Sequence, residues 1–520
     1  MRRFNVTGLC VPDQDYMVDI SNKISQIMVM VERGDYFTIN RARQYGKTTV
    51  FSRLERVLAA QGYSVARISF EGIGDEPFEN AESFCGTLQR QISYALERHD
   101  AKYSKKWLRQ PAKNFEELDK KLNILCKGRK VVLMIDETDK TSNNLVFLRF
   151  IGMLRDKYLR RKDDLSYAFH NVILAGVYDI KNLKIKLIKS GHYQLKDGEK
   201  RINSPWNIAA DFRVDMSFST SEIATMLNEY EKDHKTGMDI KAISEEIRAY
   251  TNGYPYLVSR LCKTIDEDLE KDWTSNGLQE AVKLILIEQS TLFDDLIKNV
   301  EGDDELNSLL KRNILCGEKI HYNADNYAIR TGLIFGIFSQ NGNLLSVHNK
   351  IFELRLCNYY ISLKETGKEK VPRGFSPDVI ENGKLNMPLA IKKFMNHYYE
   401  LYNKSQVSFL ESECRLLFLT YMKPLLNGNG FYQIESETRD SKRMDVVIEL
   451  GPEQFIVELK IWHGEQKHEK AYEQLIKYLN SKNKSEGYLL TFDFRKRRPK
   501  KPSAKWVRKG KKKFLDCLAV

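Results

Sequence analysis

A loop that ends in Gly46-Lys47-Thr48 is the first place in this sequence where residue types and spacing indicate chemistry. The loop follows the apolar run 36–40 and opens a helical stretch, so the unpaired N–H groups and positive dipole end of that helix would face an anion. Lys47 would reach the β- and γ-phosphates of a nucleotide, and Thr48 would coordinate Mg²⁺. The full pattern G-x-x-x-x-G-K-[ST] has glycine where this chain has Arg41. The predicted phosphate-binding residues are Arg43, Gln44, Tyr45, Gly46, Lys47, Thr48 and Thr49.

An acidic pair, Asp136-Glu137, directly follows the apolar run 131–135 (VVLMI). A short apolar run of this kind is typical of a strand buried in a parallel sheet. Open α/β sheets bind ligands at the carboxyl ends of their strands. We therefore expect Asp136 to hold Mg²⁺ through water and Glu137 to orient an attacking water. The alternative is two solvated acids at the end of a strand.

A second group of polar residues, near the end of the chain, has the pattern of a metal-dependent site for phosphodiester cleavage. Asp445 leads the strand-like run 446–450, and Glu458 and Lys460 lie in the partner run 455–460. Side chains alternate along a strand, so Glu458 and Lys460 share a face of this hairpin, and Asp445 is close enough to share it. Two converging carboxylates repel each other unless a cation lies between them, and Mg²⁺ prefers such ligands. Asp445 and Glu458 would bind the metal, while Lys460 would orient a water and stabilise negative charge. The alternative is an amphipathic hairpin with solvated Glu and Lys.

The elements that must position the first site alternate between strand and helix over residues 1–215. Helical stretches at 48–61 and 83–98 separate apolar runs, and such alternation predicts a parallel sheet covered by helices. The strand-like runs are 36–40, 65–70, 131–135 and 171–177. Helical periodicity replaces the strand signals over 216–290, which we interpret as a helical lid subdomain.

The rest of the chain divides into smaller parts. Residues 291–362 combine short helices with strands expected at 327–330 and 344–347, the second after a Gly342-Asn343 turn, which suits a winged-helix-like subdomain. Residues 363–384 are the best linker candidate. A final α/β domain is expected over 385–494, and residues 495–520 are expected to form a basic tail.

Charge and cysteine usage restrict the classes of protein. Residues 495–513 hold twelve Lys or Arg and no acid, and removing those charges from the net +13 leaves about +1 for the rest of the chain. The tail would either engage phosphates by releasing counterions or stay solvated and disordered. Eight cysteines stand singly, which argues against zinc fingers and disulfide scaffolds and favours a reducing cytoplasm. No apolar run could span a bilayer, and no secretory signal is visible, so a cytoplasmic location without a membrane is expected.

The N-terminal two thirds resembles bacterial AAA-ATPase-like proteins of the STAND-related group. Residues 34–49 (GDYFTINRARQYGKTT) carry the resemblance, because the phosphate loop of that group often also lacks the first glycine. Segments 16–19 (YMVD), 204–208 (SPWNI) and 251–257 (TNGYPYL) fit as well. The last resembles the Gly-x-Pro motif of STAND ATPases, which implies that Pro255 lies near the adenine of ATP. Arg155, Arg160 and Arg161 are candidates for an arginine finger.

The C-terminal domain resembles the PD-(D/E)XK nuclease superfamily, with Asp445 and the triplet Glu458-Leu459-Lys460 matching its motif. That superfamily often has a further acid on a preceding helix, which implies Glu413. It often has a polar residue facing the site from the following helix, which implies Gln474. Proteins that couple an AAA-like ATPase to such a domain form a bacterial family, and this chain resembles a member over nearly its whole length.

These resemblances imply a cytoplasmic P-loop ATPase with helical and winged-helix subdomains, followed by a small α/β PD-(D/E)XK nuclease-like domain. ATP and Mg²⁺ would be its cofactors, with Mn²⁺ as a substitute in the nuclease site, and DNA or RNA would be its partner. ATPases of this kind also admit a homo-oligomer. The alternative is an ATP-dependent signalling or scaffold protein whose nuclease-like domain is inactive, and a transcription regulator built on the winged-helix segment is a third interpretation.

Overall fold

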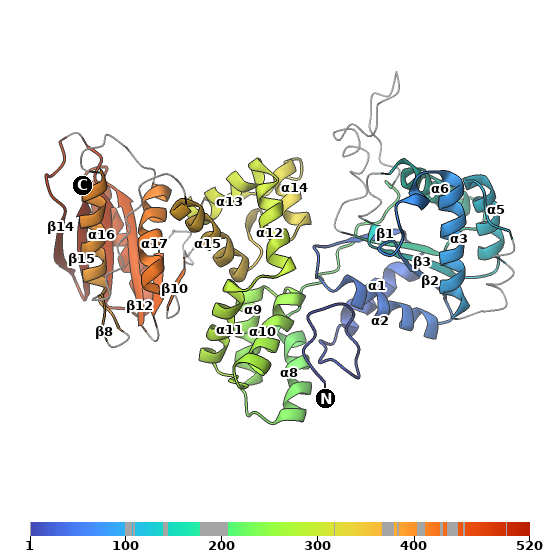
Figure 1. The fold of residues 1–520 in the computed structure, drawn as a ribbon, viewed down its shortest axis with the longest axis horizontal. Helices are drawn as coiled ribbons and strands as arrows, with labels where there is room; N and C mark the ends of the chain where they lie inside the picture. Colours follow the sequence, from blue (N-terminus) through green and yellow to red (C-terminus); the bar gives the residue numbers. More distant parts are fainter. Residues whose placement is uncertain are drawn as a thin grey trace, which may run out of the picture. The chain divides into compact units, whose positions relative to one another are not determined.

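The computed structural model describes most of the chain, in two compact units that are treated separately below (Figure 1). The first unit comprises Met1–Ile285 with two short returning segments, and the second comprises most of the remainder up to Val520. The described residues are 2–98, 107, 110–138, 144–176, 206–316, 318–366, 379–381, 384–402, 411–426, 430–433, 446–450, 453–495 and 497–520.

A four-stranded parallel sheet forms the centre of the first unit and confirms the predicted α/β architecture. The strand order is β1-β4-β3-β2, so β4 separates the strand before the phosphate loop from the strand before the acidic pair. Every residue of β3 and β4 is buried, as expected of central parallel strands. The strands are β1 (Phe37–Asn40), β2 (Ser64–Ser69), β3 (Val131–Asp136) and β4 (Asn171–Gly176).

Helices cover both faces of this sheet (Figure 1). On one face, alternate strand residues such as Leu133 and Leu174 join a core with Leu88, Leu122 and Ile151 from three helices. The helices of that face are α3 (Ala81–Glu97), α5 (Phe115–Cys126) and α6 (Leu145–Lys162), with the short 3-10 helix η1 (Glu76–Phe78) beside α3. The other face carries α1 (Ser21–Glu32) and α2 (Lys47–Ala60), whose apolar residues are likewise buried.

Four helices follow in the first unit, as predicted for residues 216–290. They are α8 (Thr220–His234), α9 (Ile240–Thr251), α10 (Pro255–Asp268) and α11 (Ser275–Ile287). Helix α8 begins with a capping box, in which Ser219 and Glu222 each bond the other's backbone N–H. The N-terminal segment packs against α8, with the Phe4 ring 5.1 Å from the rings of both Tyr16 and Tyr230.

Residues 291–366 contain a small three-stranded sheet of order β5-β7-β6 among helices. The Gly342-Asn343 turn joins β6 to β7, as predicted. The strand predicted at 327–330 is wrong, because these residues begin helix α14. Asn326 accepts a hydrogen bond from the Ile329 N–H at 2.9 Å and so caps that helix. The elements are α12 (Thr291–Glu301), α13 (Asp304–Cys316), β5 (Ile320–His321), α14 (Tyr327–Ile334), β6 (Phe338–Asn341), β7 (Leu344–Val347) and α15 (Lys350–Thr366).

Most of the predicted linker 363–384 lies outside the described residues. Helix α15 continues to Thr366, so the first residues assigned to the linker are helical. Its last residues contribute to a short antiparallel pair, β8 (Ile380–Glu381) and β9 (Lys384–Leu385).

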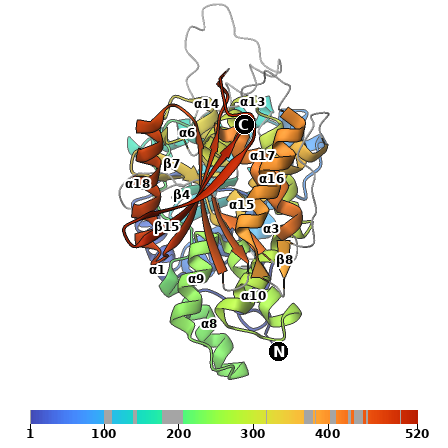
Figure 2. The same cartoon turned by 90° about the vertical axis from the view of Figure 1, so that its left-hand side faces the viewer.

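The C-terminal domain of the second unit is built on a six-stranded sheet of order β10-β11-β12-β13-β15-β14. Helix α18 (Glu465–Ser481) covers one face, and α16 (Met387–Tyr402) and α17 (Glu411–Leu426) cover the other (Figure 2). Leu475 and Leu489 belong to the core under α18, whereas Phe394 of α16 contacts Phe492 on the opposite face. The strands are β10 (Gly430–Gln433), β11 (Val446–Leu450), β12 (Glu453–Ile461), β13 (Glu486–Phe492), β14 (Ser503–Lys509) and β15 (Lys512–Ala519). The hairpin predicted over 446–460 is therefore present as β11 and β12, with α17 before it and α18 after it in the chain.

The prediction of a basic tail over 495–520 is wrong, because these residues contribute two further strands to this sheet. Strand β15 pairs in parallel with β13, and β14 pairs with β15. Residues 514–519 are apolar except for Asp516, and all of them are buried in the sheet apart from Leu518, which is half-buried. Two strands of this sheet therefore follow β13 in the chain. Gly510, with φ of 61°, makes the two-residue turn between the new strands. In the described residues, no helix is both long and apolar enough to cross a bilayer.

Candidate functional site

The phosphate loop has left-handed backbone conformations at Gln44 (φ 56°) and Gly46 (φ 75°), directly before α2. Arg41 is not among the residues with positive φ, so an ordinary side chain fits where the full pattern has glycine. Its guanidinium donates to the carbonyls of Asn40 and Val214 at 2.8 and 2.9 Å. Arg41 therefore holds the start of the loop onto the chain segment that follows the sheet.

Lys47 is 6% exposed and lies inside the loop. Its ammonium donates to the carbonyls of Arg41 and Ala42 at 3.0 and 2.9 Å. A buried ammonium held by backbone carbonyls is a fixed positive charge at the N-terminus of α2. The loop therefore presents a cation and a helix dipole at one place.

The two predicted halves of the site meet between α2 and β3. The Thr48 hydroxyl donates to a carboxylate oxygen of Asp136 at 2.9 Å, and Asp136 is 4% exposed. The second carboxylate oxygen of Asp136 accepts the Glu137 N–H at 3.0 Å. Glu137 itself has φ of 55°, a conformation that costs a non-glycine residue energy and that collects at functional sites.

The segment around Pro255 packs against the same loop. Tyr254 donates its hydroxyl to the Arg43 carbonyl at 2.6 Å, and Pro255 opens α10 as its first residue. Gly253 has φ of 70°, and a Cβ there would lie 2.1 Å from the Phe218 carbonyl oxygen. The backbone approach at this position therefore requires glycine.

A cavity of about 320 Å³ lies beside the loop, within the first unit. The N-terminal segment, the phosphate loop, α8 and α10 all contribute to its walls. Apolar lining residues include Val18, Met216, Phe218, Met226 and Pro255. The polar residues Asn5, Lys23, Gln44 and Thr49 also face it. A cavity of this size and mixed lining next to an anion-binding loop suits the base and sugar of a nucleotide.

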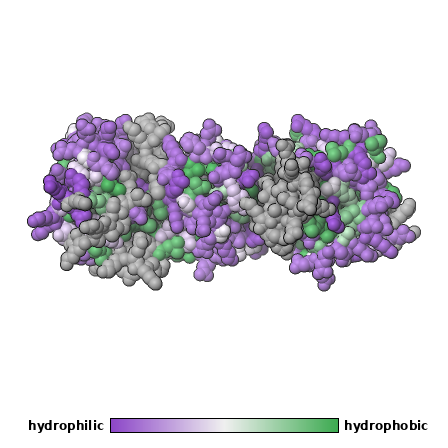
Figure 3. Space-filling model, turned by 90° about the horizontal axis from the view of Figure 1, so that it is seen from above, coloured by the Kyte–Doolittle hydropathy of each residue, from purple (hydrophilic) through white to green (hydrophobic). Residues whose placement is uncertain are grey.

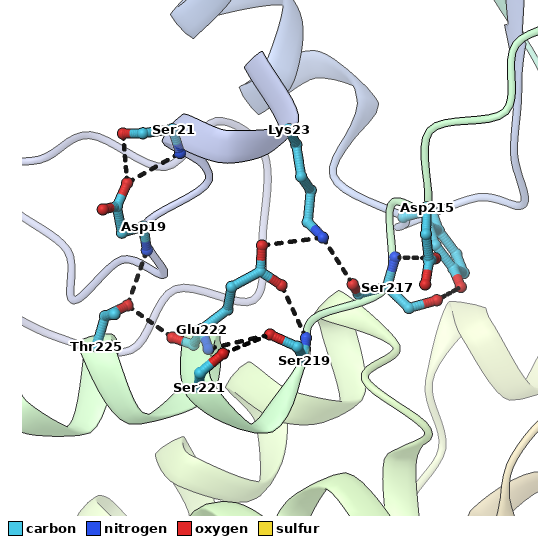
Figure 4. A network of polar contacts seen from close by, with 10 residues as sticks. Asp19, Ser21, Lys23, Asp215, Ser217, Ser219, Ser221, Glu222 and Thr225 are labelled. Carbon is cyan, nitrogen blue, oxygen red and sulfur yellow. Dashed lines mark hydrogen bonds and ion pairs between the residues drawn. The ribbon is translucent and has the colours of Figure 1, made fainter. Parts of the chain in front are cut away.

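A polar network connects this cavity to α8 (Figure 4). Lys23, 7% exposed, forms an ion pair with Glu222 at 3.0 Å and donates to the Ser217 carbonyl at 3.0 Å. The Tyr45 hydroxyl of the phosphate loop lies 2.7 Å from the Ser217 hydroxyl. The Asp19 N–H donates to the Thr225 hydroxyl at 2.9 Å. Lys23 was absent from the predicted site, because its partners are far away in the sequence.

The candidate arginine fingers are engaged in the fold of the first unit. Arg161 donates to three backbone carbonyls, those of Gly34, Phe169 and His170. Arg160 pairs with Asp119 and Asp156, and Arg155 donates to the Asn207 side chain at 2.8 Å.

In the C-terminal domain, Glu458 and Lys460 lie together on the face of the sheet that α18 covers. Glu458 is 1% exposed, and the Lys460 ammonium lies 3.0 Å from its carboxylate. Strand β13 carries Leu489 beside Glu458 in register, and Leu489 belongs to the core under α18. A carboxylate buried to this degree requires a neighbouring cation to stay ionised.

Among the described residues, only one of the others predicted for the nuclease-like site lies on the same side of the sheet as Glu458. Asp445 lies outside the described residues, as does Ser204-Pro205 of the first unit. Gln474 is half-buried on α18, on the same side of the sheet as Glu458. Glu413 is exposed on α17, the helix of the opposite face. Over the described ranges, no group of three or more acidic, histidine or cysteine side chains gathers in a metal-binding arrangement.

A histidine–aspartate pair close to Lys460 was missed in the sequence. His468 of α18 lies 3.2 Å from Asp516 of β15 and 3.5 Å from the Thr491 hydroxyl. Thr491 is the direct neighbour of Lys460 across the sheet. Burial would raise the pKa of Asp516, yet hydrogen bonds from His468 and Tyr472 hold that pKa below its ordinary value.

Comparison with known proteins covers mainly the first two thirds of the chain. A curated relative, an uncharacterised WD repeat-containing protein of Synechocystis, is 22% identical over 290 residues, which is 54% of this chain and 22% of the relative. The chain thus spans only about a fifth of that relative's length.

Two similar solved structures are a Walker-type ATPase of Pyrococcus abyssi and the ORC2 protein of Aeropyrum pernix in complexes with ADPNP and ADP. The first is 11% identical with a TM-score of 0.45, over 68% of this chain and 99% of that one. The second is 11% identical with a TM-score of 0.33, over 68% of this chain and 96% of that one.

A family model described as AAA-like domain matches residues 16–354. This match covers well over half of the chain and includes the phosphate loop, the acidic pair and the helices that follow them. The protein therefore belongs to the AAA-like domain family, and its first unit contains a parallel α/β sheet.

Proposed function

We propose that this protein binds and hydrolyses ATP in its first unit and carries in its second unit a metal-dependent nuclease domain that acts on DNA or RNA. The observation that carries the first half is the hydrogen bond of 2.9 Å between Thr48 and Asp136. These residues come from distant parts of the sequence and meet at the N-terminus of α2, beside the Lys47 ammonium. This is the arrangement that a triphosphate with its metal ion needs.

The residues fit a bound Mg²⁺ ion, because a hydroxyl and a carboxylate are the oxygen ligands this cation prefers. Thr48 would hold the ion directly and Asp136 through water, and the ion would neutralise charge on the β- and γ-phosphates. Lys47 would bind the same phosphates, and the cavity would hold the base and sugar, with Pro255 in its wall. Glu137, next to Asp136, would hold the attacking water and take its proton.

The proposed ATPase activity of the first unit is tested by measuring ATP binding and ATP hydrolysis in matched variants. Glu137→Gln should retain ATP binding and lose most hydrolysis, on the order of 10²-fold, because a general base typically contributes that much. Lys241→Ala, an exposed change on α9, serves as the control that leaves both unchanged. Hydrolysis at the normal rate by the Glu137→Gln protein would contradict the role given to Glu137.

The nuclease half is supported by the Glu458–Lys460 pair on a buried sheet face. In this proposal Glu458 and Asp445 hold Mg²⁺ or Mn²⁺, while Lys460 orients water and stabilises the charged transition state. The alternative is a signalling or scaffold protein in which this domain is inactive. Incubation of the protein with plasmid or RNA and either metal ion, with and without ATP, separates the two: metal-dependent cleavage supports the nuclease, and its absence under all conditions supports the scaffold.

A further inference from the structure

The basic residues near the C-terminus form part of the folded sheet that carries Glu458 and Lys460. Strand β14 is the edge strand of that sheet, and the chain reaches it through residues 493–502, directly after β13. The space-filling view shows strongly hydrophilic side chains over this edge (Figure 3). The exposed basic residues of the region are Arg495, Arg497, Lys500, Lys501, Lys505, Arg508, Lys511 and Lys513.

Strand register places the start of β14 at the same end of the sheet as Lys460, whereas Arg508 and Lys513 lie at the opposite end. Lys460 pairs with Thr491, Thr491 pairs with Leu518, and Leu518 pairs with Ser503 at the start of β14. The segment 493–502 leaves the sheet just beyond this row. Because neighbouring strands lie about 4.8 Å apart, β14 is only about 15 Å from β12.

A direct contact joins the start of the basic run to the strand of the candidate site. The Arg495 guanidinium lies over the Trp462 ring, 5.0 Å from its centroid. Trp462 follows Lys460 by two residues, and its backbone N–H donates to the Phe492 carbonyl at 2.8 Å. Arg495 is itself held by Asp493, with contacts down to 2.7 Å. The first cation of the run is thus fixed beside β12.

Positive charge in this region exceeds what nearby acids neutralise. Lys505 lies 3.9 Å from Asp516, and Lys513 lies 3.9 Å from Glu486. Within the described residues, the remaining exposed cations Arg497, Lys500, Lys501, Arg508 and Lys511 have no acidic partner. Three of these cations, Arg497, Lys500 and Lys501, lie close together in the sequence before β14, and such a group of unneutralised charges attracts a phosphate backbone, which binds with release of counterions.

We propose that Arg495 and residues 497–505 form a phosphate-binding track that holds a polynucleotide and leads it to the Glu458–Lys460 pair. The proposal rests on the proposed nuclease function for its substrate, but it assigns binding to residues outside the predicted site. The contacts are to phosphates, so they position the strand without reading its sequence. Lysines on an edge strand can instead serve to keep that strand from pairing with another sheet. If this were their role here, their loss would cause self-association of the protein and leave nucleic-acid binding unchanged.

The test compares two triple variants of the full chain. The track variant carries Arg497→Glu, Lys500→Glu and Lys501→Glu, and the control carries Lys384→Glu, Lys392→Glu and Lys477→Glu. All six are exposed residues of the second unit, and the net charge changes equally in both variants. Binding of a labelled single-stranded oligonucleotide and of a duplex is measured by fluorescence anisotropy over a range of salt, with a chelator present so that no cleavage occurs.

The track variant should bind at least about tenfold more weakly than wild type. The slope of log affinity against log salt should fall by about 1 for each lost lysine or arginine contact. The control should keep the wild-type slope. Equal slopes for track, control and wild-type proteins would overturn the proposal, and self-association of the track variant with unchanged binding would assign the cations to edge protection.

Failure of the track and failure of the nuclease can be distinguished because binding and cleavage are measured separately on the wild-type and track proteins. A weakened track variant together with a wild type that never cleaves would support the track and contradict the nuclease. Normal cleavage with an unchanged slope in the track variant would contradict the track alone.

Discussion

The two candidate sites of this chain are assembled in different ways. The nucleotide site uses consecutive residues of one loop and the end of another parallel strand of the same sheet, so the sheet itself brings Thr48 to 2.9 Å from Asp136. The Glu458–Lys460 site depends on side-chain alternation in β12 and on residues from other elements. The parallel sheet therefore assembles the phosphate- and metal-binding part of the first site, whereas the second site depends on sheet register and long-range packing.

The largest expected effect breaks the second site and spares the first. Lys460→Ala should lower metal-dependent cleavage of nucleic acid by about 10²–10³-fold, because loss of one transition-state charge partner typically costs that much. ATP affinity should stay at its wild-type value. Undiminished cleavage by this variant would show that Lys460 has no catalytic role.

The converse change breaks the first site. Lys47→Ala should weaken ATP binding on the order of 100-fold, since hydrogen bonds to a charged group are worth about 1.5–3 kcal/mol each. Titration with a fluorescent ATP analogue measures the affinity, and circular dichroism checks that the buried lysine was not needed for folding. Wild-type affinity in a folded Lys47→Ala protein would remove the phosphate-binding role.

A backbone substitution sharpens the comparison, because the first site requires a close approach between Gly253 and Phe218. Gly253→Ala should destabilise the first unit by about 2–5 kcal/mol, from positive φ and from overpacking against the Phe218 carbonyl. Gly237→Ala is the matched control, since Gly237 has φ of 76° and nothing within 4 Å of an added Cβ. Thermal unfolding should show a larger loss for Gly253→Ala, and equal losses would mean that the contact with Phe218 is unimportant.

The smallest expected effect concerns pH and the second unit. The pKa of Asp516 is lowered in the folded protein, so its contribution to stability is present above the unfolded pKa and is lost as pH falls through the folded one. Asp516→Asn should therefore flatten the decline in stability toward acid pH, with little change in ATP binding. Urea unfolding at several acid pH values measures this slope, and an identical slope in both proteins would exclude Asp516 as its source.

The predictable parts of the fold were those with local signals. The run VVLMI and the Gly-Lys-Thr sequence identified β3 and the start of α2, because burial in a parallel sheet and anion binding at a helix N-terminus leave short patterns. The hairpin β14–β15 was missed, since the density of Lys and Arg over 495–513 suggested a solvated tail and β14 itself is mostly exposed. Residues 327–330 were mistaken for a strand because the cap at Asn326 was not recognised.

The unpredicted parts of the sites depend on long-range contacts. The ion pair between Lys23 and Glu222 joins α1 to α8, and no spacing rule relates residues so far apart. Arg41 occupies the position of the first glycine of the loop, and only the observed backbone shows that no left-handed conformation is needed there. The pair His468–Asp516 likewise depends on the strand β15 that was not expected.

The most direct test of the central claim is calorimetric titration of ATP into wild type and Asp136→Asn, each with Mg²⁺ and with a chelator. If Thr48 and Asp136 jointly hold the metal of a bound triphosphate, Mg²⁺ should strengthen ATP binding to wild type by about tenfold or more. One hydrogen bond to a charged group is worth about 1.5 kcal/mol, which corresponds to a roughly tenfold change in affinity, and a metal contact should contribute at least as much. Asp136→Asn should bind ATP without any such gain. Affinity that is equal with and without Mg²⁺ in wild type, or a full Mg²⁺ effect that survives in Asp136→Asn, would contradict the account.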